Sequence, residues 1–158
     1  MTLRDRLHAD TTAAMRSGDA LRRDVLRMVA NSIYNTEKAK KVTLSEDEIL
    51  GVFTHAVKTR RESVDAFRKG GREDLVAKEE AEIAILTDYL PEALTNAQLE
   101  ALVDEAIAAT GASSARDLGK VMGWLAPRTR GRADGKVVSG LVAQALARAD
   151  LATHAADH

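Results

Sequence analysis

The sequence predicts an all-α protein, with an N-terminal helical bundle followed by a small module of three helices. Three observations carry this prediction. Apolar residues recur at helical spacing along most of the 158 residues. Alanine and aliphatic side chains supply nearly all of the apolar content, and only five residues are aromatic, whereas strands favour aromatic and β-branched side chains. Residues that cap or end helices stand at the ends of the apolar patterns.

Residues 1–94 are expected to form the N-terminal helical domain, which opens with two helices. Thr2 stands in the capping position of a first helix over residues 3–16. Gly18 marks its end, and Asp19 caps a long second helix. The apolar positions of the second helix that follow helical spacing are Leu21, Val25, Met28, Val29 and Ile33.

Two further helices complete this domain. Ser45 and Glu48 have the spacing of a capping box, in which each side chain accepts the other residue's backbone amide. The third helix begins there, and the glycine pair at 70–71 ends it. The fourth helix is expected over about residues 72–89, because Pro91 disfavours helical backbone in the residue before it.

The C-terminal three-helix module is expected over residues 95–150. Thr95 and Gln98 form a second capping box, and this helix stops at Gly111. Ser114 is expected to cap the next helix, which ends near Pro127. A basic loop over 128–132 leads to the final helix, and residues 151–158 are expected to be a disordered tail.

Composition excludes several classes of chemistry. The chain has no cysteine, so disulfides, thiolate nucleophiles and cysteine zinc sites are ruled out. No apolar run reaches the roughly 20 residues that span a bilayer, and the charged N-terminus lacks the apolar segment of a signal peptide. The expected location is therefore cytoplasmic, without a membrane partner.

Charge is distributed unevenly, although the net charge is only −1. Residues 1–72 and 106–136 carry an excess of basic side chains, while residues 73–105 carry ten acidic side chains and one basic one. A solvated face is the plain interpretation of the basic N-terminal stretch. Its side chains could instead extend a nucleic-acid contact or dock on the acidic helix of the same chain.

The best candidate for a binding site is the segment around the predicted basic loop. Its cations and glycines fall within seventeen residues, opposed only by Asp134, next to the amides that begin the final helix. Cations and free amides bind phosphate, and phosphate contacts position a nucleic acid without reading its bases. The expected RNA-binding residues are Lys120, Arg128, Arg130, Gly131, Arg132, Gly135 and Lys136.

Two plainer interpretations remain beside this one. The loop could simply be a solubilising basic segment, with Asp134 acting as the cap of the final helix. Trp124 could stack on a nucleobase, but a single tryptophan in a small module is more often part of the core.

Two stretches resemble the GatB/YqeY family. Residues 62–94 contain a glycine break, R-E-D-L, an acidic helix and Y-L-P, and residues 117–142 contain G-K-V-M-G, a proline and G-R-A-D-G-K. Length and order are similar to a stand-alone YqeY-like protein. The resemblance implies that the C-terminal module is related to the tRNA-contacting tail of the amidotransferase B subunit. It also brings the family's label of carbon–nitrogen ligase with glutamine as amido donor.

The residues themselves offer no catalytic set, metal site or cofactor site. A Ser–Lys amidase would need a serine held beside a desolvated lysine, and the adjacent pair Ser113-Ser114 stands where a helix cap is expected. The glycines at 131 and 135 have three residues between them instead of the four of a phosphate loop, and Val137 replaces its magnesium-binding Ser or Thr. Whether the chain is an enzyme stays open, and catalysis by the chain alone is not expected.

Together these observations favour a tRNA-binding accessory protein. One alternative is a component of a glutamine-dependent amidotransferase that acts only with other subunits. The other is a helical protein-interaction module that uses its acidic face.

Overall fold

The computed structural model describes residues 1–156, and within that range the chain is helical and contains no strand. The predicted all-α class is confirmed. The chain divides into two compact units, Met1–Pro91 and Glu92–His158, close to the boundary predicted after residue 94. No helix in the described part of the chain combines the length and the apolar character needed to cross a bilayer.

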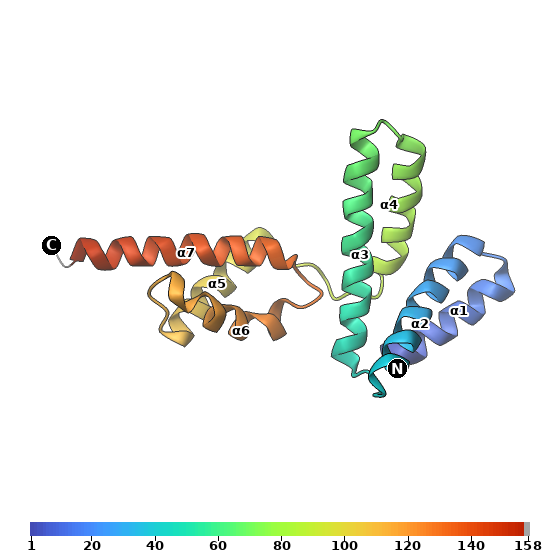
Figure 1. Ribbon diagram of the computed structural model, residues 1–158, viewed down its shortest axis with the longest axis horizontal. Coiled ribbons are helices and arrows are strands. Elements are labelled where there is room, and N and C mark those ends of the chain that lie inside the picture. Colours follow the sequence, from blue (N-terminus) through green and yellow to red (C-terminus); the bar gives the residue numbers. More distant parts are fainter. Residues whose placement is uncertain (157–158) are drawn as a thin grey trace. The chain divides into compact units, whose positions relative to one another are not determined.

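The first unit consists of two helical hairpins (Figure 1). Helix α1 (Leu3–Ser17) packs along α2 (Ala20–Lys40), and α3 (Glu46–Lys69) packs along α4 (Glu73–Thr87). The apolar stripes of all four helices meet in one core. Its most deeply buried side chains include Val25, Leu26, Val29, Ile49, Phe53 and Leu86.

The predicted helix ends are found in this unit. Thr2, Asp19 and Ser45 each accept a backbone amide of the helix that follows. Ser45 and Glu48 form the predicted capping box, with both hydrogen bonds at 3.2 Å. Gly71 adopts a left-handed φ of 71° after α3, a conformation that side chains with a Cβ disfavour.

Ion pairs join α3 to the acidic helix α4. Arg60 donates from Nε to Glu82 at 2.9 Å, and these two side chains are only 10% and 13% exposed. Arg68 and Glu80 form a second pair at 3.0 Å on the surface. Part of the basic N-terminal stretch therefore docks on the acidic helix of its own chain, which was one of the interpretations left open above.

A buried tyrosine links α1 and α3 beyond the end of α4. The Tyr89 ring stacks on Phe53 with 4.7 Å between ring centroids, and the Arg6 guanidinium lies 4.2 Å from the Tyr89 ring. The Tyr89 hydroxyl donates a hydrogen bond to the Asp10 carboxylate. Burial first, and then this hydrogen bond, hold the pKa of Tyr89 well above its usual value.

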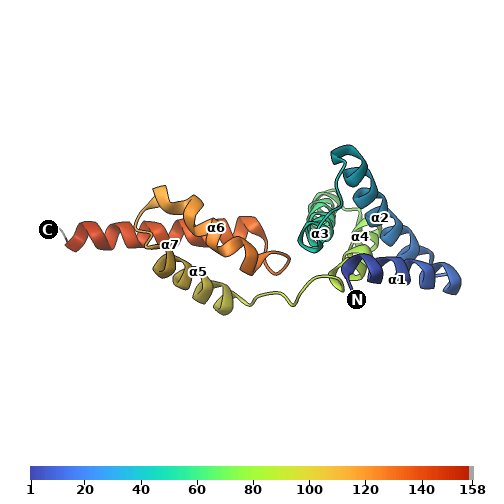
Figure 2. The ribbon, with the colours of Figure 1, turned by 90° about the horizontal axis from the view of Figure 1, so that it is seen from below.

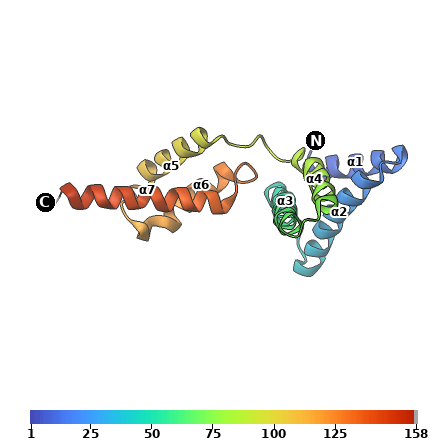
Figure 3. The ribbon, with the colours of Figure 1, turned by 90° about the horizontal axis from the view of Figure 1, so that it is seen from above.

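The second unit is a three-helix module (Figures 2 and 3). It contains α5 (Asn96–Thr110), α6 (Leu118–Thr129) and α7 (Gly135–Ala156), with a short 3-10 helix (Ala115–Asp117) before α6. The predicted capping box of Thr95 and Gln98 begins α5. The core of this unit contains Leu99, Val103, Ala106, Val121, Leu125, Val138, Val142 and Leu146.

The end of α6 lies within two residues of its predicted position near Pro127, whereas the predicted end of α7 was wrong. Helix α6 continues beyond Pro127 to Thr129. The Arg128 guanidinium and the Thr129 hydroxyl donate to the carbonyl oxygens of Trp124 and Leu125, which stabilises the last turn around the proline.

Helix α7 continues to Ala156, whereas residues 151–158 were expected to be a disordered tail. Alanine-rich sequence favours helix, and His154 lies one turn from Asp150, with 3.4 Å between Nε2 and Oδ1. Residues 157–158 lie outside the described part of the chain.

Candidate nucleic-acid interface

A row of side chains at a spacing of four runs along α6. Lys120, Trp124 and Arg128 therefore share one face of the helix. Lys120 and Arg128 are exposed, while Trp124 is half-buried and packs against the core of the second unit. The structure thus brings together two of the predicted cations with the single tryptophan between them.

Arg128 lies flat against this tryptophan. The centre of its guanidinium is 3.6 Å from the indole centroid, and Nη1 donates to the Trp124 carbonyl oxygen at 2.6 Å. Cation–π contact and this hydrogen bond hold the arginine in one orientation. Trp124 packs at the edge of the core, as predicted for a single tryptophan in a small module. The side chain that stacks on it is Arg128.

Asp117 is the acidic neighbour of this row. Its carboxylate accepts the Ser113 amide at 2.8 Å, and this bond is the main reason that the pKa of Asp117 is lowered. The charges of Lys120 and Arg116 contribute further to the same shift. The positive charge of Lys120 is therefore partly offset within the chain.

The turn between α6 and α7 is built around Gly131, which adopts a left-handed φ of 74°. Here Arg132 has a structural part that the sequence did not predict. Its Nε donates to the Glu92 carbonyl oxygen at 3.0 Å, and its own carbonyl oxygen accepts the Leu94 amide at 2.9 Å. Arg132 is thus tied to the segment before α5, which limits its availability to a ligand.

Asp134 caps the final helix, which confirms one part of the plainer interpretation. Its Oδ1 accepts the Lys136 amide at 2.8 Å, and its carbonyl oxygen accepts the Val138 amide at 3.0 Å. The amides that begin α7 were expected to be open to an anion, but the Lys136 amide is already hydrogen-bonded. Gly135 lies at the exposed start of this helix, and the side chain of Lys136 is exposed beside it.

Two arginines of the second unit use uncharged acceptors. Arg128 and Arg132 donate to backbone carbonyl oxygens, which carry no net charge. Neutral acceptors leave the positive charge of a guanidinium uncompensated. In the first unit, ion pairs with carboxylates involve Arg4, Arg6, Arg22, Arg23, Arg60, Arg68 and Arg72.

The remaining predicted residues lie on the same stretch of backbone. Arg130 and Gly131 belong to the turn, and they connect the row on α6 to Gly135 and Lys136 at the start of α7. We call the surface made by Lys120, Arg128, Arg130, Gly131, Gly135 and Lys136 the α6–α7 surface.

The fold and the α6–α7 surface describe a small all-α protein of two units, the second of which carries a basic surface with an arginine stacked on a tryptophan. Comparison with known proteins identifies the family to which this protein belongs. The chain belongs to the family of YqeY-like proteins, whose family model matches residues 4–146. The family resemblance predicted from the two sequence motifs is confirmed.

Curated relatives of the chain carry one recurring name, altered inheritance of mitochondria protein 41, mitochondrial. The protein of that name from Pyrenophora tritici-repentis is 31% identical over 137 residues, which are 85% of this chain and 75% of the relative. That from Lachancea thermotolerans is 28% identical, covering 86% of this chain and 76% of the relative. That from Kluyveromyces lactis is 38% identical over 84 residues, covering 52% and 45%.

These names correct one expectation. The cytoplasmic location predicted from composition is contradicted, because the relatives are named as mitochondrial proteins. The prediction failed because charge, cysteine content and hydropathy do not distinguish one aqueous compartment from another.

Proposed function

We propose that this YqeY-like protein is an RNA-binding accessory protein and that the α6–α7 surface is its contact with RNA, tRNA being the first partner to test. The observation that carries this proposal is the guanidinium of Arg128. It is exposed, held in place by Trp124 and hydrogen-bonded to a carbonyl oxygen, and within residues 1–156 it forms no ion pair with a carboxylate. Lys136 adds a second exposed cation and Lys120 a third, partly offset by Asp117.

The chemistry of this surface suits phosphate and unpaired bases better than a duplex read by sequence. Lysine and arginine side chains bind backbone phosphates, which fixes the register of an RNA without specifying its sequence. The plane of Arg128 offers a further contact, because an unpaired base stacks on a guanidinium. The resemblance of the second unit to the tRNA-contacting tail of the amidotransferase B subunit supports the same partner.

The proposal is tested by filter binding of unacylated tRNA over a series of salt concentrations. If three cations meet phosphates, log Kd should change with log salt with a slope of about 2–3. Charge reversal at Lys120, Arg128 and Lys136 together should remove most of the binding at low salt and flatten this slope.

A matched control uses three exposed cations of α3. Reversal of Lys58, Arg61 and Lys69 changes the net charge by the same amount on the first unit. This variant should keep most of the affinity. The proposal fails if the unaltered protein does not bind tRNA at low salt, or if both triple variants lose affinity equally.

A further inference from the structure

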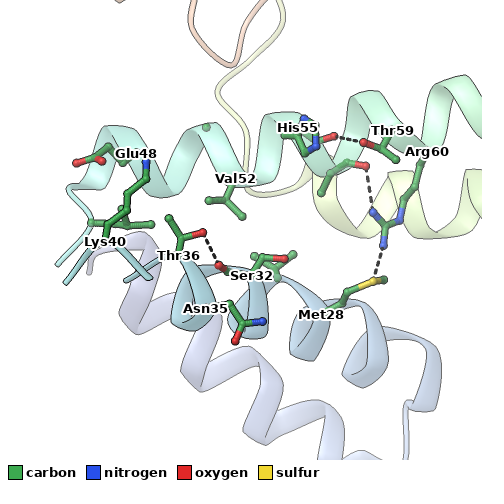
Figure 4. Close-up of a pocket in the computed structure, with 14 residues that line it drawn as sticks. Met28, Ser32, Asn35, Thr36, Lys40, Glu48, Val52, His55, Thr59 and Arg60 are labelled. Atoms are coloured by element: carbon green, nitrogen blue, oxygen red, sulfur yellow. Dashed lines mark hydrogen bonds between the residues drawn. The ribbon is translucent and has the colours of Figure 1, made fainter. Parts of the chain in front are cut away.

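An open groove lies between α2 and α3 in the first unit (Figure 4), but its charges are compensated within the chain. Lys40 and Glu48 lie together at one end and offset each other, and Arg60 pairs with Glu82 at 2.9 Å. The groove therefore offers no charge that would select a ligand. A more specific arrangement is found in the second unit, where residues 92–94 dock on the turn between α6 and α7.

This docking depends on two hydrogen bonds of one residue, Arg132. Its Nε donates to the Glu92 carbonyl oxygen at 3.0 Å. Its own carbonyl oxygen accepts the Leu94 amide at 2.9 Å. Arg132 therefore holds residues 92–94 with its side chain and its backbone at once. We call these two bonds the Arg132 clamp.

Apolar contacts support the clamp on both sides. Leu94 and Ala133 pack against the core of the second unit, one from the docked segment and the other from the turn. Leu94 directly precedes Thr95, whose capping box begins α5. The docked segment is thus fixed at its C-terminal end by α5 and at Glu92 by Arg132.

The turn that the clamp holds is part of the α6–α7 surface. Its other hydrogen bonds are local, because the Thr129 carbonyl oxygen accepts the amides of Arg132 at 2.9 Å and Ala133 at 3.1 Å. The clamp adds bonds to a segment forty residues away. Exposed turns are mobile unless such contacts order them. The clamp therefore orders the backbone on which Arg130 and Gly131 lie.

We propose that Arg132 is a positioning residue of the α6–α7 surface, which orders the turn so that RNA phosphates meet a preformed set of contacts. This inference rests on the proposed function. A loop that is ordered before binding loses less conformational entropy when the ligand binds, and affinity rises accordingly. The Nε–H of Arg132 is used by the Glu92 carbonyl oxygen, which removes one of the edges through which a guanidinium grips phosphate.

The same contact couples RNA binding to the start of the second unit. If the clamped turn binds RNA more tightly than the released turn, bound RNA must favour the clamp by the same factor, because such coupling is reciprocal. Residues 92–94 should therefore be held more firmly when RNA is bound.

Two substitutions distinguish positioning from a direct phosphate contact. Arg132→Lys keeps the positive charge but places a methylene group where arginine has Nε, so the bond to Glu92 is lost. Arg132→Met removes the charge as well. In filter binding of unacylated tRNA, both variants should bind about three- to tenfold more weakly than the unaltered protein. The slope of log Kd against log salt should be the same in all three proteins.

The matched control is Lys136→Met, which removes an exposed cation that the proposed function assigns to a phosphate. Its slope should fall by about 0.7–0.9, the change expected for one lost phosphate contact. Trp124 lies in the second unit, so its fluorescence verifies that this unit is folded in each variant.

Amide hydrogen exchange measures the clamp itself. The Leu94 amide should exchange at least about fivefold faster in Arg132→Met than in the unaltered protein. The Ala112 amide, which donates to the Ile107 carbonyl oxygen at 3.2 Å at the other end of α5, should exchange at the same rate in both. Addition of tRNA should slow Leu94 exchange in the unaltered protein and leave it unchanged in Arg132→Met.

Two outcomes would overturn the inference and leave the proposed function intact. If Arg132→Lys binds tRNA as tightly as the unaltered protein while Arg132→Met shows the reduced slope of Lys136→Met, Arg132 contacts phosphate directly. If tRNA slows Leu94 exchange equally in Arg132→Met, RNA covers residues 92–94 and the clamp does not transmit its binding. Absence of tRNA binding to the unaltered protein would instead refute the proposed function, and this inference with it.

Discussion

The buried ion pair between Arg60 and Glu82 leads to a sharp prediction about stability. Glu82→Gln keeps the shape of the side chain and removes its charge, which leaves Arg60 charged, 8% exposed and without a carboxylate. Removing one partner of a buried pair costs about 3–5 kcal/mol. We expect about 3 kcal/mol here, because Arg60 also donates to the Ala56 carbonyl oxygen at 3.0 Å.

For a unit of this size, such a loss lowers the thermal midpoint by about 12–24 °C. Urea titration followed by far-UV circular dichroism measures the change. Trp124 is the only tryptophan of the chain and lies in the second unit, so its fluorescence follows that unit alone. The early transition should appear in the ellipticity of the variant and be absent from its fluorescence.

Two comparisons make the reasoning refutable. Glu80→Gln removes the partner of Arg68, and because both of these side chains are 55% exposed, it should cost less than about 1 kcal/mol. The double substitution Arg60→Met with Glu82→Leu replaces the buried pair by apolar side chains and should restore most of the stability. If Glu82→Gln costs no more than Glu80→Gln, the buried pair does not stabilise the α3–α4 hairpin as argued.

Three further outcomes are expected. Tyr89→Phe removes the hydrogen bond to Asp10 and should lower the free energy of unfolding by about 1–2 kcal/mol. The pKa of Tyr89 is raised in the folded protein, so above about pH 10 the tyrosine ionises in the unfolded chain while it stays protonated in the folded one. The unaltered protein should therefore lose stability above about pH 10 more steeply than this variant. Lys41→Gly should raise stability by about 0.5–1 kcal/mol in denaturant titrations, since Lys41 ends α2 with a left-handed φ of 56°. Thr95→Ala should lower the free energy of unfolding by about 1 kcal/mol, measured by Trp124 fluorescence, because it removes the cap of α5. If Lys41→Gly or Thr95→Ala leaves the stability unchanged, the argument for that substitution is refuted.

Capping residues, glycines and prolines in the sequence were enough to predict most helix ends. Capping boxes such as Ser45 with Glu48 need only residues three apart, so the sequence contains all the information they require. Helix α6 continues two residues past Pro127, because the Arg128 guanidinium and the Thr129 hydroxyl donate to carbonyl oxygens of its last turn.

The sequence was enough to predict which cations form the α6–α7 surface, but not the hydrogen bonds that hold them in place. Lys120, Trp124 and Arg128 share a face at helical spacing, which the sequence contains. The bond from Arg132 to the Glu92 carbonyl oxygen spans forty residues, and no local pattern predicts it.

The length of α7 has a consequence for how the protein responds to proteases. Leu146 is the last buried residue of α7 within residues 135–155, so the turns that follow it there contribute little to the core. Arg148 is the only lysine or arginine after Lys136. A brief trypsin digestion under native conditions should therefore cut first after Arg148 and release residues 149–158, leaving a trimmed protein whose folded core is intact.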